Sequence, residues 1–338
     1  VATDNGTAAV ASSLTPIAGG LFMLNPAVPA TNKAVAIQNT SGDYIAYKAP
    51  EGVAKVEAGV NGATYLYVFE NNNIIAVDPQ VTGGGALVTV GGGSGACAAA
   101  NSCYLAEQIS NLTYATGSTA PSFSSVTGIG VLVSGTKLIF ADPGNNRIAS
   151  IDVSTCGPQA SGSNLGACTV TTVASGHPFI GLGLAQGGTN YVATDTTGQI
   201  YLINGSTVSS FGLTTGSVQD GALGVVAPPA ATTTAAPYLV QGNANNFFST
   251  TATFTPTVPY NILPFAATAP VFNVAPNAAL KILADTSNGT IVATAPGSVK
   301  APFGIVWLPA AQVPPASPAL TPDSYIFADN GNVRTLIP

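Results

Sequence analysis

Charged residues are scarce in this 338-residue chain. Asp, Glu, Lys and Arg together make up 7% of it, whereas ordinary soluble domains contain roughly 25%. Eight Lys plus Arg stand against 14 Asp plus Glu, which gives a formal net charge of −6. So few cations on an acidic chain argue against nucleic acid and anionic membrane surfaces as partners.

Several catalytic and anchoring patterns are also missing. The chain has one histidine, His177, no Gly-x-Ser-x-Gly elbow of a serine hydrolase, and no Lys after its glycine-rich segments to form a phosphate loop. No apolar run approaches the length of a membrane-spanning helix, and no Cys-x-x-Cys-His motif for attaching haem occurs. We therefore predict no catalytic residue, no metal ligand and no cofactor, and we favour a non-enzymatic role.

Glycine (38 residues) and proline (25) are abundant, as in turn-rich β proteins. One phrase within Lys137–Asp152 recurs along the chain. It consists of the apolar run Leu138–Ala141, the turn residues Asp142–Asn146 and the apolar run Ile148–Ile151. Pro presets φ, and Gly and Asn accept positive φ, so this stretch predicts a β-hairpin.

Six weaker copies of the hairpin give the fold. Corresponding positions in the last four, Asp195, Gln241, Asp285 and Asp329, are 46, 44 and 44 residues apart. A unit of that length with several short strands is a propeller blade. We predict an all-β β-propeller of seven four-stranded blades, with six as the alternative. The copies lie at 34–47, 65–77, 191–202, 238–246, 282–293 and 325–336.

One propeller domain is predicted over 21–338, preceded at 1–20 by a lone strand. The last hairpin ends close to Pro338, so its blade lacks an outer strand, which the N-terminal strand can supply to close the ring. The alternative is that this strand completes the sheet of a neighbouring subunit. Its residues are Thr7, Ala8, Ala9, Val10, Ala11, Ser12, Ser13 and Leu14.

Two segments of the N-terminal half are harder to place. Val53–Val56 fits either the outer strand of the first blade or the first strand of the second blade, and this ambiguity keeps six blades open. Residues 91–125 have no blade pattern and are predicted to be an insertion that rises from one face of the disc.

Four cysteines fall into two close pairs, Cys97 with Cys103 and Cys156 with Cys168. An even number at short spacing predicts two loop-closing disulfides in an oxidising compartment, although this is one of three ways to pair them. A zinc site is the lesser alternative, because Cys-x-x-Cys spacing and a nearby His are missing.

Further signs agree with export. The sequence starts at Val1, and we expect a secreted protein whose signal peptide has been removed, with trimming of the sequence as the alternative. Five Asn-x-Ser/Thr sites are candidate glycan acceptors, although chance matches are expected in a chain rich in these residues. They are Asn5, Asn39, Asn111, Asn204 and Asn288.

The stretch Asp142-Pro-Gly-Asn-Asn-Arg-Ile148 resembles the NHL-repeat and related β-propellers, which include regucalcin-like lactonases and strictosidine-synthase-like proteins. The lactonase branch implies a calcium or other divalent ion in the central channel, held by a Glu, Asn residues and an Asp. That ligand set does not map onto this chain. Carboxylates at equivalent blade positions are instead expected to cap their own turns. They are Glu70, Asp142, Asp195, Asp285 and Asp329.

His177, in Ser175-Gly-His-Pro178, fits either a general base or a turn between blades, and the adjacent proline favours the turn. Two functions are left. The favoured one is an exported structural propeller that self-assembles into an extracellular filament, surface layer or adhesive coat, because soluble monomers usually keep charge on their surface. The alternative is a secreted lactonase-like hydrolase or ligand-binding propeller that uses the central channel, with or without a divalent metal.

Overall fold

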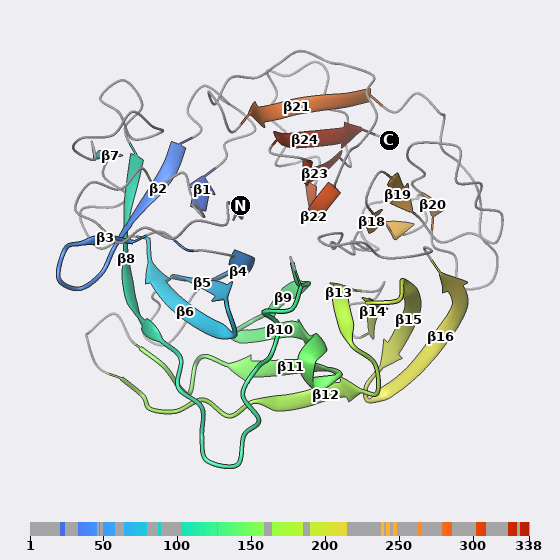
Figure 1. The fold of residues 1–338 in the computed structure, drawn as a ribbon, viewed down its shortest axis with the longest axis horizontal. Coiled ribbons are helices and arrows are strands. Elements are labelled where there is room, and N and C mark those ends of the chain that lie inside the picture. The colour runs from blue at the N-terminus through green and yellow to red at the C-terminus, as the bar shows by residue number, and fades with distance from the viewer. Residues whose placement is uncertain are drawn as a thin grey trace.

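The protein is an all-β propeller whose sheets fan out around a common centre (Figure 1). Six sheets and one short 3-10 turn make up the part of the chain that the computed structural model describes. The described residues are 21–23, 33–45, 47, 50–57, 64–79, 87–88, 103–126, 128–158, 164–184, 190–214, 238–239, 241–243, 246–248, 263–264, 279–285, 302–308, 324–329 and 332–337. The predicted fold class is confirmed, whereas the number of blades stays a prediction.

Two blades follow the expected meander from the centre outward. One has the strand order β9-β10-β11-β12 and the next has β13-β14-β15-β16, each antiparallel. Their innermost strands are β9 and β13, and β12 and β16 lie at the periphery (Figure 1). The strands are β9 (Val131–Ser134), β10 (Lys137–Asp142), β11 (Arg147–Asp152), β12 (Thr171–Ser175), β13 (Phe179–Leu184), β14 (Asn190–Asp195), β15 (Gln199–Asn204) and β16 (Thr207–Thr214).

The β-hairpin predicted within Lys137–Asp152 is confirmed. Strands β10 and β11 pair from Lys137 opposite Asp152 to Asp142 opposite Arg147. Between them Pro143–Asn145 form the 3-10 turn η3, which ends at Asn146 with a left-handed φ of 51°. The sequence supplies proline where φ must be near −65° and asparagine where φ is positive, so turn chemistry sets the register.

The N-terminal blades share one eight-stranded sheet. Strand β4 pairs with β5, so Val53–Val56 belongs to the second blade. Strand β8 pairs antiparallel with β6 and parallel with β2, which joins the two blades. The strands are β1 (Leu21–Met23), β2 (Lys33–Gln38), β3 (Tyr44–Ile45), β4 (Pro50–Val56), β5 (Tyr65–Glu70), β6 (Asn73–Asp78), β7 (Leu87–Val88) and β8 (Cys103–Asn111).

The prediction that 91–125 lacks a blade strand was wrong, because β8 lies within it. Most side chains of β8 are only partly buried, and its buried positions, Cys103 and Ala106, are three residues apart. A strand paired on both edges but half-exposed on its faces does not show the two-residue apolar alternation that reveals strands in a sequence.

The C-terminal sheet has the order β21-β24-β23-β22, and the predicted hairpin at 325–336 is confirmed by β23 and β24. Strand β21 pairs with β24. Residues 290–293 lie outside the described residues, so the hairpin at 282–293 stays a prediction. Strand β21 takes the outer place that sequence analysis gave to Thr7–Leu14, which also lie outside the described residues. The strands are β17 (Tyr238–Leu239), β18 (Gln241–Asn243), β19 (Asn246–Phe248), β20 (Leu263–Pro264), β21 (Ala279–Asp285), β22 (Pro302–Leu308), β23 (Ser324–Asp329) and β24 (Asn332–Ile337).

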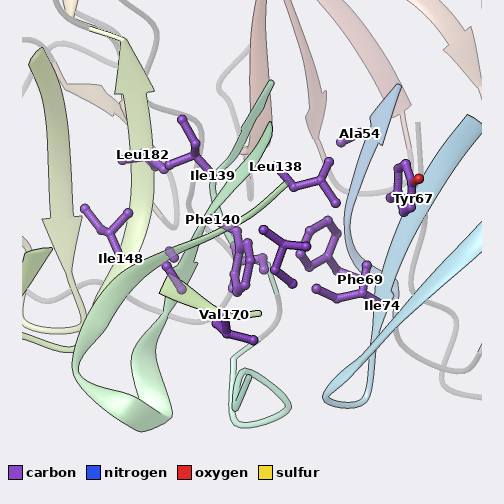
Figure 2. Packing of buried hydrophobic residues seen from close by; sticks show 14 of the residues in the cluster. Ala54, Tyr67, Phe69, Ile74, Leu138, Ile139, Phe140, Ile148, Val170 and Leu182 are labelled. Carbon is purple, nitrogen blue, oxygen red and sulfur yellow. The ribbon is translucent and has the colours of Figure 1, made fainter. Parts of the chain in front are cut away.

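An aromatic cluster fills the space between the second and third blades (Figure 2). The ring of Phe69 lies 5.2 Å from that of Phe140 and 5.7 Å from that of Phe123, centroid to centroid. All three side chains are fully buried. Burial of rings of this size contributes a large part of the free energy of folding, so adjacent blades are packed as one core.

Nearer the centre, adjacent blades are joined directly through their backbones. The amide of Ile129 donates to the carbonyl of Glu51 at 2.9 Å, and the amide of Gly130 donates to that of Ile180 at 2.6 Å. A Cβ on Gly130 would lie 2.2 Å from the nitrogen of Leu182. Glycine is therefore required where the three blades meet.

Candidate functional site

A carboxylate, a phenol and an imidazole meet beside the turn between β14 and β15. Asp195 ends β14, and its Oδ1 accepts hydrogen bonds from the backbone nitrogens of Thr197 (2.8 Å) and Gln199 (3.1 Å) and from Thr197 Oγ1 (2.6 Å). The prediction that Asp195 caps its own turn is confirmed. Its other oxygen, Oδ2, faces the cluster.

Tyr201 connects Asp195 to His177. The Tyr201 hydroxyl donates to Asp195 Oδ2 at 2.8 Å and lies 2.9 Å from His177 Nδ1. A carboxylate can only accept, so the phenol proton points toward Asp195, and Nδ1–H of His177 donates to the phenol oxygen. This arrangement leaves Nε2 of a neutral His177 as a hydrogen-bond acceptor.

The cluster runs from the protein interior to solvent. The side chain of Asp195 is 4% exposed and that of His177 is 39% exposed. Burial raises the pKa of Tyr201, and its hydrogen bond to Asp195 and the charge of that carboxylate raise it further. The phenol therefore stays protonated and orients the imidazole, which is an arrangement suited to a general base or a polar binding group.

Backbone contacts fix the segment that carries His177. The amide of Phe179 donates to the carbonyl of His177 at 2.8 Å, and the amide of Thr196 donates to that of Pro178 at 3.1 Å. The predicted position of His177 in a turn between blades is confirmed. Its link to Tyr201 was not predicted, because Tyr201 sits on a strand where the alternating pattern indicates only core.

Asp142, at the equivalent position of the preceding blade, has a different role. Its Oδ2 accepts from Arg147 Nε at 2.7 Å, and its Oδ1 accepts from the backbone nitrogen of Ser122 at 2.7 Å. It makes no side-chain cap to η3, so the prediction that it caps its own turn was wrong. Arg147 lies directly opposite Asp142 in the hairpin, and the side chains of Arg147 and Asn145 donate to the carboxylate in place of backbone amides of the turn.

The buried pair of Arg147 and Asp142 also binds the segment that precedes β9. Arg147 Nη2 donates to the carbonyl of Thr119 at 2.7 Å, and Nη1 donates to Thr172 Oγ1 at 3.2 Å. The side chains of Arg147 and Asp142 are 8% and 0% exposed. The pair is closed to solvent, and we assign it to stability rather than to binding.

The turn of the second blade is also stabilised by neighbouring segments. Asn71 and Asn72 have positive φ values of 48° and 66°. The Glu51 carboxylate accepts from the Asn71 nitrogen, at 3.0 Å for the nearer oxygen, and Asn72 Oδ1 accepts from the nitrogens of Phe123 (2.6 Å) and Ser124 (2.8 Å). Glu70 ends β5 opposite Asn73.

Residues described by the structure include no group of three or more His, Cys, Asp or Glu side chains arranged to hold a metal ion. Asp285 ends β21 and Asp329 ends β23, and capping of their turns by these two residues stays a prediction.

The predicted disulfide between Cys156 and Cys168 is confirmed, with Cα atoms 4.9 Å apart. Cys103 is also disulfide-bonded. Cys97 lies outside the described residues, so its pairing with Cys103 stays a prediction.

Three candidate glycan acceptors can be located. Asn111 and Asn204 are exposed, whereas Asn39 Oδ1 accepts from the nitrogens of Ser41 and Asp43 at 2.9 Å each. Asn5 and Asn288 lie outside the described part of the chain. Attachment of glycans is a prediction at all five positions.

The rim of the disc presents a long, uncharged strand edge. Strand β16, Thr207-Val-Ser-Ser-Phe-Gly-Leu-Thr214, is the last in its sheet and contains no charged residue and no proline. The side chains of Thr207, Ser209 and Ser210 are exposed. Outer strands of soluble proteins usually carry Lys, Pro or a covering element that blocks pairing with another chain.

No family model matches the chain, and no curated protein matches it significantly. Similar solved structures include two crystals of BBS1N in complex with ARL6DN. The crystal soaked with lead has a TM-score of 0.38 and 9% identity, and covers 100% of this chain and 94% of the other. The crystal soaked with mercury has a TM-score of 0.35 and 10% identity, with coverages of 100% and 93%. Both TM-scores are below 0.5, so the fold rests on the sheet topology.

No helix within the described residues has the length and apolar character needed to cross a bilayer.

Proposed function

We propose that this chain is an exported structural β-propeller that binds copies of itself to form an extracellular filament, surface layer or adhesive coat. The observation that carries the proposal is the uncharged outer edge of β16. Its backbone groups lie at the rim of the disc, and no side chain of the strand is charged to repel a second strand. β-Strand addition to such an edge needs little rearrangement of the receiving subunit.

Contacts within and between the described blades support this function. Backbone hydrogen bonds join adjacent blades, and a buried ion pair and a disulfide stabilise the blade built on β9–β12. A repeating assembly requires each subunit to present the same surface, and contacts between different faces of identical subunits extend into open fibres. Low overall charge reduces the repulsion between copies.

Negative-stain electron microscopy and sedimentation of the native material test the proposal. We expect ordered polymers whose repeat is close to one propeller thickness or diameter. Ser209→Lys, which adds a charge to the β16 edge, should decrease the polymer fraction, whereas Thr116→Lys adds the same charge to an exposed turn away from that edge. A monodisperse monomer in native material would overturn the proposal.

A second function is favoured by the cluster of His177, Tyr201 and Asp195. A partly exposed imidazole that Tyr201 links to the buried carboxylate of Asp195 suits acid–base chemistry or ligand binding. This function would fit the lactonase-like branch of the NHL-repeat and regucalcin-like propellers, to which we propose a distant relation. Hydrolysis of simple lactones by the native protein and by His177→Gln, with and without Ca²⁺, tests it. Equal rates in both proteins would exclude His177 from such a reaction.

A further inference from the structure

We propose that the segment Thr7–Leu14 of one copy pairs with the outer edge of β16 on a neighbouring copy. This inference rests on the proposed self-assembly and identifies its donor and acceptor. It is carried by three observations on strand β21, strand β16 and the linker 15–20.

The first observation is that the outer strand position of the last blade, where the N-terminal strand would close the ring, is occupied by another strand. The strand expected beside β24 at the outer edge of the last blade is β21, whose pairing runs from Ala279 opposite Ile337 to Asp285 opposite Asn332. Thr7–Leu14 reads as a strand in the sequence, and a strand needs an edge to satisfy its backbone hydrogen bonds. The edge of β24 is thus closed to the segment, and the proposal assigns it another edge.

The second observation is that β16 matches the segment in length and chemistry. Both contain eight residues, neither contains a charge or proline, and Ser, Thr, Val and Leu occur in both. Within the described four-stranded sheets, the other two outer strands are poorer acceptors. Strand β12 has five residues, and β21 contains Lys281 and Asp285, the kind of charge that discourages edge pairing.

The third observation concerns reach. Only 15–20 separate the segment from β1, and six extended residues span at most about 20 Å. Strand β1 lies on the inner side of β2, across the centre from β16 (Figure 1). To pair with β16 of its own chain, the segment would first have to cross the centre of the propeller. It would then have to reach about 19 Å further outward, which is three strand spacings from β13 to β16 and one more for the added strand. The segment therefore reaches the β16 edge of a neighbour more readily than its own.

Cysteine cross-linking of the full-length chain tests the pairing. Chains with Val10→Cys are mixed with chains that carry Val208→Cys, Ser209→Cys or Ser210→Cys, so that successive registers of the two strands are sampled. We expect a disulfide-linked species of twice the monomer mass from at least one mixture, and none with Thr116→Cys. Val10→Pro should decrease the polymer fraction at least tenfold while the midpoint of thermal unfolding stays unchanged.

The outcomes separate this inference from the proposed function. Polymers that persist in Val10→Pro and give no cross-link at any of the three β16 positions would overturn the strand pairing and leave self-assembly intact. A cross-link within one chain of a Val10→Cys/Ser209→Cys variant would overturn pairing between neighbours. Absence of polymers from the native protein would overturn both.

Discussion

The amide of Gly130 donates to the carbonyl of Ile180 across 2.6 Å and joins the innermost regions of two neighbouring blades. Gly130 lies just before β9, and Ile180 lies within β13. This contact allows no side chain on Gly130, because the nearest atoms belong to the backbone and Cβ of Leu182. The packing of the blades around the centre therefore depends on glycine at this position.

Gly130→Ala is expected to destabilise the fold by about 2 kcal/mol or more, since backbone atoms must move to admit the methyl group. Urea unfolding followed by circular dichroism measures the change. Gly128→Ala is the matched control, because its nearest neighbour would be the Glu51 carbonyl oxygen at an ordinary 3.6 Å. Equal losses in both variants would contradict this explanation.

Arg147→Ala should destabilise the protein by about 3–5 kcal/mol, because Asp142 is left buried without its charged partner. The change also removes the hydrogen bond to the carbonyl of Thr119. Thermal unfolding at neutral pH tests it. Lys55→Ala breaks the exposed ion pair with Glu57, where no measurable change is expected, so a similar loss in both variants would refute the importance of burial.

Stability should fall above about pH 10 because of buried tyrosines. Burial, assisted by the charge of Asp78, raises the pKa of Tyr65 to about 12. Burial, assisted by the charge of Asp142, raises the pKa of Tyr114 to about 12.

Between pH 10 and 12 the unfolded chain releases these protons before the folded chain does. The free energy of unfolding should therefore decrease by up to roughly 1 kcal/mol per pH unit for each tyrosine. Urea unfolding at pH 8 and pH 11 measures this decrease, and Tyr65→Phe should lessen it. Identical stability at both pH values would contradict the prediction.

Tyr201→Phe should cost about 1–3 kcal/mol, because Asp195 Oδ2 loses the phenol that donates to it inside the protein. The partly buried Tyr191, on the adjacent strand β14, provides a comparison through Tyr191→Phe. Chemical unfolding measures both variants. In addition, His177 should become more mobile in NMR relaxation experiments, because its Nδ1 loses its partner; an unchanged imidazole would argue against the cluster.

Removal of the Cys156–Cys168 disulfide should destabilise the protein by about 3 kcal/mol, since it closes a short loop and restricts the unfolded chain. The double change Cys156→Ser/Cys168→Ser avoids an unpaired thiol. Scanning calorimetry under non-reducing conditions measures the shift in melting temperature. A reductant should lower the melting temperature of the native protein toward that of the variant, and no shift in either case would contradict a stabilising role.

The sequence alone determined the repeating hairpins, the all-β class and one disulfide. Turn residues such as Pro143 and Asn146 restrict the backbone by their own covalent structure, and Cys156 and Cys168 are close along the chain, so these features depend on local chemistry. Strand partners between distant segments do not. The pairing of β8 with both β2 and β6, and of β21 with β24, is chosen by which edges remain open after the blades pack.

The same distinction applies to the candidate site. His177 was recognised as a turn residue from its neighbour Pro178, yet nothing in the sequence links it to Tyr201, 24 residues away. That contact exists because the turn before β13 and the strand β15 converge on the end of β14. Likewise Asp142 and Asp195 occupy equivalent repeat positions, but Arg147 opposite one and Tyr201 near the other give them different partners. Local residues determine the repeated hairpin, and tertiary packing determines which side chains each copy of it contacts.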